Sequence, residues 1–444
     1  MAQPVVTPAE MRAIDAAAPD PVEALVARAG AAVARLALDL LGGTYGRRVV
    51  VVAGKGNNGA DGRAAAVRLR RRGVRVEVLD AAVAPDRLPP SDLVIDAAYG
   101  TGFRGEYKAP DPAGAPVLAV DIPSGVNGLS GEAGAGAVRA ARTVTFAALK
   151  PGLLLGEGRE RAGEVTAADI GLDVSSATAA LVEPSDVPAW LPARPVHAHK
   201  WQAALYVVAG SPGMTGAAHL CARAAMRAGA GTVRLAIPGA PPDAPFLEVV
   251  ARAVPAAGWA AAVLEDAKRT KAVVLGPGLG RAEEVQAAVR ELVARAPQPL
   301  VIDADGLYAL DGGPLGRTGG TVLTPHDGEF ARLTGAKPGA DRLGATRDLA
   351  ARTGAAALLK GATTIVAAPG GRALFSATGD ARLATAGTGD VLAGVIGAFL
   401  AMGLDPLRAA GLGAYVHGAA GRRGWRRGLV AGDLLDLLPA VLNP

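Results

Sequence analysis

The chain has 444 residues and a formal net charge of +5, from 46 basic and 41 acidic side chains, which is too mild to indicate a nucleic-acid-binding protein. Half of the residues are hydrophobic and only 4% are aromatic, so we expect two or three cores built from small aliphatic side chains. Cys221 is the single cysteine, which excludes an internal disulfide and a thiolate metal site.

The sequence carries no recognisable targeting or membrane signal. The first residues lack the basic start and apolar segment of a signal peptide, and no uninterrupted apolar run reaches transmembrane length. We therefore expect a cytoplasmic enzyme, assembled as a homo-oligomer, that binds neither membranes nor nucleic acid.

The first half of the chain alternates between helical and strand patterns. Residues 8–41 predict two helices, with Pro19 and Pro21 at the break between them. Short apolar runs follow, and each ends in glycine or a polar residue. The expected strands are 48–53, 74–79, 93–96, 117–120 and 143–146. This alternation predicts a doubly wound α/β domain with a parallel sheet.

The loop after the first strand carries Gly54, Gly56 and Gly59, the spacing that dinucleotide-binding dehydrogenases use. Asp61 would lie where the diphosphate of such a cofactor approaches, and its charge would repel phosphate. Paired Asn side chains beside an acid instead suit a polar ligand or a monovalent cation. An NAD-dependent oxidoreductase stays open as an alternative.

Acids in three loops of this half point to one site. Asp61 lies in the first loop, whereas Asp96 and Asp121 end later strands. The carboxyl ends of parallel strands meet at one edge of a sheet, where open α/β folds bind ligands. A single strand-end Asp is often only a helix cap, but three such loops predict a shared site.

These motifs resemble those of the NAD(P)H-hydrate epimerase domain, a Rossmann-like fold, over about residues 8–175. The resemblance rests on segments 55–62, 94–102, 121–125 and 145–152. It implies that Asp121 is the acid/base group and that Asn58, Asp96 and Ser124 bind K⁺. The residues implied to hold the hydrated nicotinamide nucleotide are Asn57, Asn58, Gly59, Ala60, Asp61, Gly100, Thr101, Gly102, Phe103, Arg104, Gly105 and Glu106.

Ala60 departs from the family motif, which has glycine there. If Ala60 had a positive φ, its methyl group would cost about 1 kcal/mol and shift the loop. A first domain that has lost catalysis and only supports the second domain therefore stays open.

The proline-rich residues 175–200 predict a linker without a central strand, so we expect domains at 1–180 and 181–444. The α/β alternation then restarts. The expected strands are 205–210, 232–237, 272–276, 300–303, 322–325 and 355–359, followed by a hairpin at 364–368 and 372–375.

Near the end of the chain, Gly387, Thr388, Gly389 and Asp390 lead directly into the apolar run 391–400. This pattern predicts a glycine-rich turn at the start of a buried helix, whose first backbone amides can bind phosphate or an oxyanion. Asp390 could take a proton from a hydroxyl beside that phosphate, or it could only stabilise the helix dipole.

From about residue 185 onward, the chain resembles the NAD(P)H-hydrate dehydratase, a ribokinase-like family that uses ADP or ATP. The resemblance rests on segments 210–217, 276–280, 303–305, 324–326, 360–361 and 386–390. It implies that Ala217, Gly278, His326 and Asp390 contact the hydrated cofactor. The residues implied to hold the adenine nucleotide are Lys360, Gly361, Ala362, Thr363, Thr364 and Gly389. Asp327 departs from the family's usual proline and adds negative charge near the ligand.

Together the resemblances predict two three-layer α/β/α domains, Rossmann-like then ribokinase-like, that repair hydrated NADH and NADPH. Asp390 would take the hydroxyl proton as the hydroxyl attacks the terminal phosphoryl group, with Mg²⁺ and the amides of residues 387–389 stabilising charge. Loss of phosphate would restore NAD(P)H, with AMP as the second product from ADP. The first domain would interconvert the R and S hydrates. A vitamin-precursor kinase of the ribokinase type with an accessory Rossmann domain is the main alternative.

Overall fold

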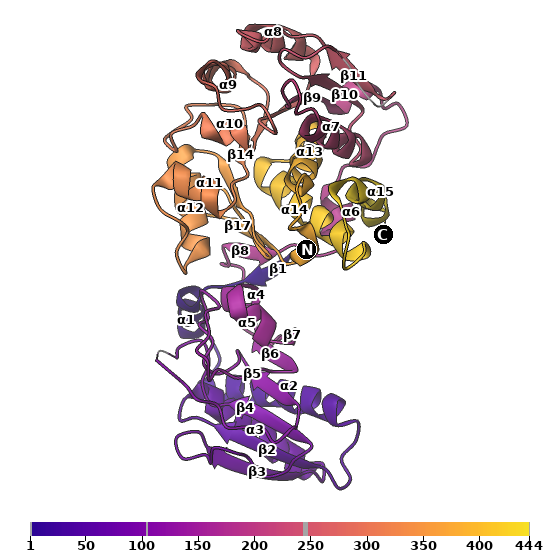
Figure 1. Ribbon diagram of the computed structural model, residues 1–444. Helices are drawn as coiled ribbons and strands as arrows, with labels where there is room; N and C mark the ends of the chain where they lie inside the picture. Colours follow the sequence, from indigo (N-terminus) through magenta and orange to yellow (C-terminus); the bar gives the residue numbers. More distant parts are fainter. Residues whose placement is uncertain (1, 104, 243–246, 444) are drawn as a thin grey trace. The chain divides into compact units, whose positions relative to one another are not determined.

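The computed structural model describes residues 2–103, 105–242 and 247–443, and the chain divides into two compact units (Figure 1). Gln3–Thr178 form the N-terminal domain, and the chain from Ala179 onward forms the C-terminal domain. Both are α/β domains built on largely parallel sheets, as predicted.

The N-terminal domain contains one parallel sheet in the strand order β3-β2-β4-β5-β6-β7. Its elements are β1 (Gln3–Val5), α1 (Pro8–Ala16), α2 (Val22–Leu41), β2 (Arg48–Ala53), α3 (Asn57–Arg71), β3 (Arg75–Asp80), β4 (Leu93–Ala97), β5 (Val117–Val120), β6 (Arg142–Phe146), α4 (Pro151–Leu154), α5 (Gly156–Arg161) and β7 (Glu164–Ala168). The sequence patterns found β2 to β6 but missed the edge strand β7.

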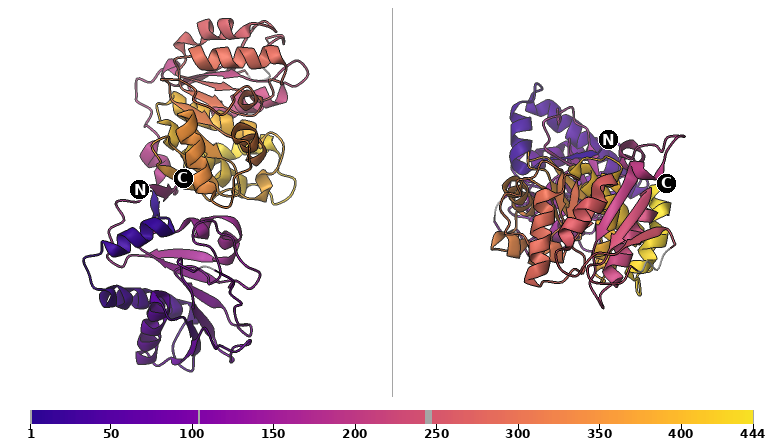
Figure 2. Two further views of the ribbon diagram at one scale, coloured as in Figure 1. Left: turned by 90° about the vertical axis from the view of Figure 1, so that its left-hand side faces the viewer. Right: turned by 90° about the horizontal axis from the view of Figure 1, so that it is seen from above.

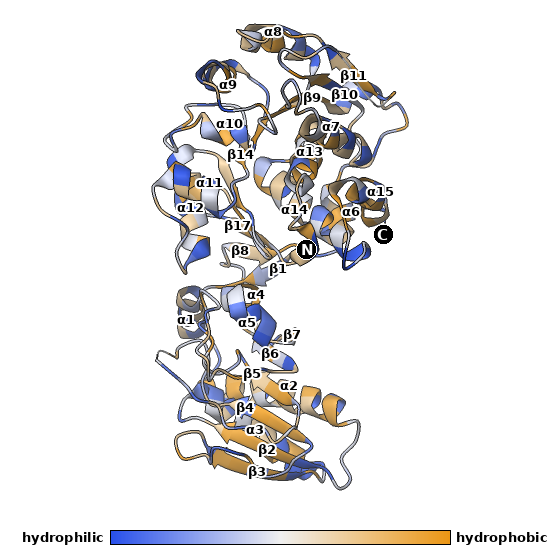
Figure 3. Ribbon diagram, viewed as in Figure 1, coloured by the Kyte–Doolittle hydropathy of each residue, from blue (hydrophilic) through white to orange (hydrophobic). Residues whose placement is uncertain are grey.

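The two faces of this sheet are covered differently. Side chains alternate along a strand, so Val49 and Val51 pack in the core with α2 and α3, whereas Val50 and Val52 face the other way. The second face packs largely against loop residues such as Leu88 and Tyr107, in place of a full helical layer. Figure 3 shows the central strands in the colours of hydrophobic residues, as expected for a sheet buried on both faces.

The strand order creates a crevice at one edge of the sheet. From β2 the chain moves to β3 on one side, and β4 then pairs with β2 on the other side. The loops that follow β2 and β4 therefore diverge at their carboxyl ends. Open α/β sheets bind ligands at such a switch point.

The strands that the C-terminal domain contributes to its sheet run in the order β8-β17-β16-β15-β14-β13-β12-β9-β10-β11. Its strands are β8 (Ala179–Leu181), β9 (Ala204–Val208), β10 (Thr232–Ala236), β11 (Val249–Arg252), β12 (Ala272–Leu275), β13 (Leu300–Ile302), β14 (Thr321–Leu323), β15 (Ala356–Leu359), β16 (Thr364–Ala367) and β17 (Ala373–Ser376). Its α-helices are α6 (Asp186–Trp190), α7 (Gly216–Arg227), α8 (Trp259–Asp266), α9 (Glu283–Arg295), α10 (Asp305–Tyr308), α11 (Asp327–Thr334), α12 (Arg342–Thr353), α13 (Thr388–Ala401), α14 (Pro406–Arg423) and α15 (Ala431–Leu442). The predicted hairpin is the antiparallel pair β16 and β17.

Helices cover both faces of the C-terminal sheet (Figures 1 and 2). The helices α7, α13, α14 and α15 share one core with strands β9, β12 and β15. Figure 1 shows α9 to α12 on the opposite side. In the described part of the chain, no helix is both long and apolar enough to span a membrane.

The expected linker is partly structured. Ala179 and Ala180, which the sequence analysis assigned to the first domain, lie in β8, and this strand pairs in parallel with β17. Val182 and Val187 are buried in the C-terminal core. The proline-rich composition concealed this short strand, because a strand of three residues leaves little periodic signal.

Gly394→Ala is expected to destabilise the C-terminal domain, because a Cβ at this position of α13 would lie 2.2 Å from the carbonyl oxygen of Cys221 on α7. Overpacking of this kind typically costs about 1–3 kcal/mol. Gly432→Ala in α15, where a methyl group meets no neighbour, is the matched control. Thermal unfolding should give a lower midpoint for Gly394→Ala only. Equal midpoints would contradict the close packing of α13 on α7.

Candidate functional sites

A cavity of about 770 Å³ opens in the N-terminal domain at the switch point of its sheet. Its walls come from α1, α2, the start of α3, the loop after β4 and the ends of β5 and β6. The lining residues are Met11, Asp15, Val22, Leu25, Val26, Ala29, Lys55, Gly56, Asn57, Asn58, Asp61, Ala98, Tyr99, Gly100, Thr101, Gly102, Phe103, Asp121, Phe146, Lys150 and Ile170. We call this the N-terminal cavity.

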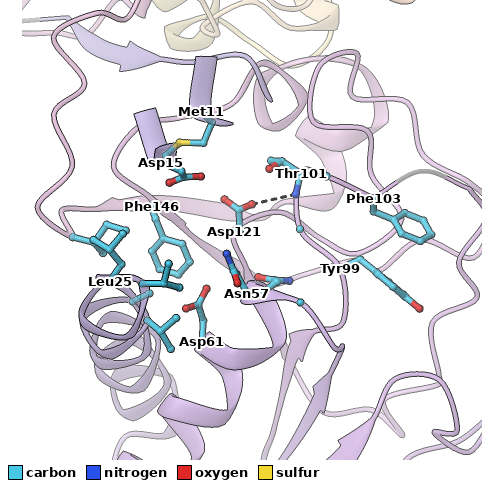
Figure 4. Close-up of a pocket in the computed structure, with 18 of the residues that line it drawn as sticks. Met11, Asp15, Leu25, Asn57, Asp61, Tyr99, Thr101, Phe103, Asp121 and Phe146 are labelled. Atoms are coloured by element: carbon cyan, nitrogen blue, oxygen red, sulfur yellow. Dashed lines mark hydrogen bonds between the residues drawn. The ribbon is translucent and has the colours of Figure 1, made fainter. Parts of the chain in front are cut away.

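Asp121 lies at the base of this cavity, directly after β5 (Figure 4). Its φ of +66° is in the left-handed region, which costs a residue with a side chain roughly 1–2 kcal/mol. The backbone N–H of Thr101 donates to its carboxylate at 3.2 Å, and the Thr145 hydroxyl donates at 3.2 Å. This strained backbone directs the carboxylate toward the ligand space.

Lys150 forms an ion pair with Asp121 and stabilises its negative charge. Its Nζ lies 2.8 Å from the Asp121 carboxylate, and the lysine side chain is only 1% exposed. It also donates to the Thr145 hydroxyl at 2.8 Å and to the Phe146 carbonyl at 3.0 Å. Burial alone would raise the pKa of Asp121, but the charge and hydrogen bond of Lys150 lower it overall. Asp121 is therefore ionised at neutral pH.

Two further carboxylates line the same cavity. Asp61, on α3, is 7% exposed, and burial together with the nearby Asp121 and Asp15 raises its pKa to about 8. Burial also raises the pKa of Asp15 on α1, although Lys150 opposes this shift. The cavity thus combines one ionised carboxylate with one that keeps its proton at neutral pH.

The segment Asn57–Asp61 forms the start of α3 at the cavity. Gly59 fits against the strand end, since a Cβ there would lie 1.9 Å from the Gly54 carbonyl oxygen. Ala60 lies within the helix and is not among the residues with positive φ, so the strain considered for its methyl group does not arise. Asn57, Asn58 and Asp61 line the cavity.

Only part of the second predicted binding segment, residues 100–106, lines the N-terminal cavity. Gly100, Thr101, Gly102 and Phe103 line it, whereas Gly105 and Glu106 do not, and Arg104 lies outside the described residues. The Phe103 ring packs against Tyr99 with centroids 4.3 Å apart.

The three residues expected to bind K⁺ include a buried carboxylate that pairs with no cation among the described residues. Asp96 is 2% exposed, and the backbone N–H and hydroxyl of Ser124 donate to it at 2.8 and 2.7 Å. Burial raises the pKa of Asp96 to about 6 despite these hydrogen bonds. Both amide atoms of Asn58 are buried without a hydrogen-bond partner in the described structure. A cation at the Asn58 amide oxygen would satisfy that atom, and one at Asp96 would stabilise the carboxylate charge, so the chemistry of each donor suits a monovalent cation.

The C-terminal domain has its own switch point, between β9 and β12. The backbone N–H of Gly210 donates to the Pro277 carbonyl at 2.7 Å, and the Ser211 hydroxyl donates to the Gly278 carbonyl at 3.1 Å. A Cβ on Gly278 would lie 3.2 Å from the Ala217 methyl group, so these two predicted residues are neighbours.

Lys360, Asp303 and Gly389 meet at the start of α13. Lys360 Nζ lies 2.6 Å from the Asp303 carboxylate, which is only 2% exposed. A Cβ on Gly389 would lie 3.6 Å from Lys360 Nζ and 3.9 Å from the Asp303 carboxylate. Burial disfavours the lysine charge, but Asp303 and its neighbours raise the pKa of Lys360 overall. A fixed cation and the first amides of a helix therefore lie together, which suits phosphate.

Asp390 is half-buried in the first turn of α13. Burial, followed by the charge of Asp303, raises its pKa to about 6, while Lys360 opposes the rise. The carboxylate is thus largely ionised at neutral pH yet close enough to its pKa to accept a proton, as a general base must.

The remaining residues predicted to bind ligands in this domain are His326 and the loop 361–364. His326 begins α11, where its Nδ1 accepts from the backbone N–H groups of Gly328 and Glu329 at 2.9 and 3.2 Å. The Pro325 carbonyl accepts from the Lys360 N–H at 2.9 Å, which places His326 at the same edge of the sheet. Gly361 and Ala362 are exposed, Thr363 is buried, and the Thr364 hydroxyl donates to the Gly361 carbonyl at 3.4 Å.

The negative charge that Asp327 was expected to add near the ligand is paired with an arginine. Arg342 on α12 donates to both of its carboxylate oxygens, at 3.0 and 2.8 Å. This bidentate pair neutralises the acid that departs from the family motif.

The sequence patterns missed Asp15, the pairing of Lys150 with Asp121, and Arg342. Each comes from an element distant in sequence from its partner, so no spacing rule could find it. Among the described residues, no three His, Cys, Asp or Glu side chains form a metal-binding group. Mg²⁺ held mainly by the phosphates of a bound nucleotide would not need such a group.

Comparisons with known proteins match both halves of the chain. The family model described as YjeF-related protein N-terminus matches residues 22–89 and 79–152, and the model described as NAD(P)H-hydrate dehydratase matches residues 205–441. The bifunctional NAD(P)H-hydrate repair enzyme of Mycobacterium leprae is 40% identical over 412 residues, covering 85% of this chain and 84% of that protein.

Solved structures resemble the C-terminal domain. An ADP/ATP-dependent NAD(P)H-hydrate dehydratase from Bacillus subtilis, co-crystallised with ATP and Mg²⁺, is 33% identical with a TM-score of 0.52, covering 59% of this chain and 97% of that one. A ribokinase-like superfamily protein from Enterococcus faecalis, 21% identical with a TM-score of 0.52, covers 60% of this chain and 96% of its own and shows the fold alone.

Lys150→Met is expected to destabilise the N-terminal domain by about 3–5 kcal/mol, because it leaves the Asp121 charge buried without its cation. The pKa of Asp121 should then rise above its ordinary value, since burial no longer has an opposing charge. Denaturant unfolding and a carboxyl-carbon NMR titration measure the two effects.

The control is Lys108→Met, which removes an ion pair with Asp86 of the same 2.8 Å length but almost fully exposed. This variant should unfold like the wild type. If the two variants unfold alike, the buried pair does not support Asp121.

Proposed function

The chain belongs to the family of bifunctional NAD(P)H-hydrate repair enzymes, and we propose that it returns both epimers of hydrated NADH and NADPH to the active cofactors. The N-terminal domain, residues 1–180 by the sequence boundary, interconverts the R and S hydrates. The C-terminal domain dehydrates the S form at the expense of ADP, giving AMP and phosphate. Its cytoplasmic location and homo-oligomeric state stay predictions.

In the N-terminal cavity, the hydrated nicotinamide ring lies between the start of α3 and the loop after β4. The side chains of Asn57, Asn58 and Asp61 and the loop Gly100 to Phe103 contact the ligand, and the ionised Asp121 exchanges a proton with it. Supporting this assignment, Asp121 combines a fixed charge with a backbone that turns its carboxylate into the cavity. K⁺ held by Asn58, Asp96 and Ser124 would supply a positive charge that offsets the buried Asp96 carboxylate.

In the C-terminal domain, dehydration must expel a hydroxyl group, and hydroxide is a poor leaving group. Asp390 takes the hydroxyl proton while the hydroxyl oxygen attacks the terminal phosphoryl group of ADP, and AMP leaves. The resulting phosphate ester then loses phosphate and a ring proton, which restores the double bond of NAD(P)H. Lys360 and the amides of Gly389 and its neighbours stabilise charge on the transferred group, and Mg²⁺ bound with the nucleotide would add charge stabilisation.

One observation carries this proposal most directly. Lys360, Asp303, Gly389 and Asp390 converge at the start of α13, so one place offers a phosphate-binding cation, helix amides and a base. A kinase would use the same groups but release a stable phosphorylated product. The fate of the product therefore separates dehydration from simple phosphorylation.

Asp390→Asn is expected to lower dehydration of the S hydrate at least about 100-fold while nucleotide binding stays within a few-fold, because the amide fills the same space but cannot accept the proton. Wild-type dehydration should rise with pH through about 6, since the base form of Asp390 is required. The return of NADH absorbance and nucleotide titration calorimetry give the two readouts. Near wild-type turnover in Asp390→Asn would rule out this base, and Asp348→Asn on the exposed face of α12 is the control.

Asp121→Asn is expected to slow interconversion of the R and S hydrates by about 10²- to 10⁴-fold, because it removes the group that exchanges the proton. Chromatography of the hydrates in the absence of adenine nucleotide measures this step alone. Dehydration of the S hydrate by the same variant should be unchanged. Unchanged epimerisation would show that the assignment of Asp121 is wrong.

A further inference from the structure

The mechanism above leaves one buried carboxyl group without a catalytic role. Asp61 is 7% exposed and lines the N-terminal cavity, and in the described structure its carboxylate has no hydrogen-bond or ion-pair partner. Its oxygens are not among the fully buried side-chain atoms that lack a partner, so they open to the cavity, where a ligand can reach them. The position thus indicates a group that acts on whatever fills the cavity.

Asp61 and Asp121 reach the ligand space from different elements. Asp61 comes from the first turns of α3, whereas Asp121 follows β5. Both residues line the N-terminal cavity, and Figure 4 shows Asn57 between them with Phe146 beside it. A ring bound in the cavity can therefore meet both carboxyl groups, which reach it from separate elements.

The charged groups around the cavity give the two acids opposite protonation states. Asp121 has the buried Lys150 as its partner, and Asp61 faces Asp15 on α1 and Asp121. Lys55, before α3, is exposed, and α2 presents only Val22, Leu25, Val26 and Ala29. With burial raising its pKa to about 8, Asp61 holds a proton at neutral pH while Asp121 does not.

The substrate requires one acid and one base. In a dihydronicotinamide the ring nitrogen feeds electrons into the neighbouring double bond, so water adds its hydroxyl to the carbon next to that nitrogen. Inverting this carbon can proceed by loss of the hydroxyl as water and return of water on the other face. The hydroxyl group needs a proton donor to leave as water, and the water that adds to the other face needs a proton acceptor.

We propose that Asp61 is the general acid of epimerisation, protonating the ring hydroxyl while Asp121 serves as the base on the opposite side. This inference rests on the proposed epimerase function of the N-terminal cavity. The proton of Asp61 passes to the hydroxyl oxygen, the carbon–oxygen bond breaks with its electron pair, and water leaves. The nitrogen lone pair forms a carbon–nitrogen double bond.

A water molecule then attacks the same carbon from the other face, its electron pair forms the new bond, and its proton passes to Asp121. Exchange with solvent returns both carboxyl groups to their starting states. The reverse epimerisation uses the same steps with the two roles exchanged. In this scheme the hydroxyl oxygen of the product always comes from solvent.

The test uses the full chain without adenine nucleotide, so that only epimerisation is observed. Hydrated NADH enriched in the R form is incubated in ¹⁸O-labelled water, and chromatography with mass spectrometry follows both the S epimer and its label. The wild type should form S hydrate that carries ¹⁸O. Asp61→Asn should lower the rate at which S hydrate forms at least about 100-fold, because the amide is too weak an acid to protonate the hydroxyl, while the S hydrate that does form still carries ¹⁸O.

Two control variants and an unfolding measurement show whether a loss of epimerisation in Asp61→Asn comes from the loss of a proton donor. Asp61→Glu, which retains a carboxyl group, should recover to within about 10-fold of the wild type. Asp80→Asn, at the end of β3 and outside the cavity, should epimerise normally. Asp61→Asn should also unfold at or above the wild-type midpoint, since it replaces a neutral buried carboxyl by a neutral amide.

The outcomes are distinct. If the wild type does not interconvert the epimers, the proposed epimerase function fails. If the wild type is active and Asp61→Asn matches it, Asp61 is not the acid and the epimerase function stands. Equal inactivity of Asp61→Asn and Asp61→Glu, or an S product without ¹⁸O in the wild type, would also overturn this inference.

Discussion

Both sites depend on burying more carboxyl groups than cations at the carboxyl ends of parallel strands. In the N-terminal cavity, Asp61 and Asp121 lie with one buried cation, Lys150, which pairs with Asp121. Burial disfavours charge, so a single lysine can keep only its nearest carboxylate strongly ionised. The remaining acid then has a raised pKa and can hold a proton near neutral pH.

The C-terminal site repeats this arrangement with different residues. Lys360 pairs with Asp303, and the nearby Asp390 is left with a pKa of about 6. A shared lysine, one paired acid and one unpaired acid are thus the common electrostatic design. The roles differ because the first site must both give and accept protons, whereas the second must accept one beside a phosphoryl group.

The fold supplies this design through backbone positions that few residues tolerate. Asp121 and Ala304 both have positive φ just beyond buried strands, at +66° and +50°. Such positions cost free energy and persist where the surrounding structure fixes them, which is typical of functional sites. Gly59 and Gly276 allow backbone to approach backbone, since a Cβ at either would lie 1.9 Å from a carbonyl oxygen.

Local patterns in the sequence were enough for the central strands, the switch-point loops and the turn that carries Asp390, because each is encoded within a few residues, but not for the short or peripheral strands β1, β7, β8 and β11. They could not predict the Lys150–Asp121 pair or the pairing of Arg342 with Asp327, since these partners meet only after folding. The sequence also could not show whether Ala60 has a positive φ, because its backbone angle depends on where α3 begins.

The most direct measurement gives the full chain pure R hydrate of NADH with ADP and Mg²⁺ and follows the NADH absorbance and the nucleotide products. We expect complete return of NADH with one AMP formed per NADH restored; a stable phosphorylated product, or no NADH from the R form, would show that the two domains do not carry out this repair.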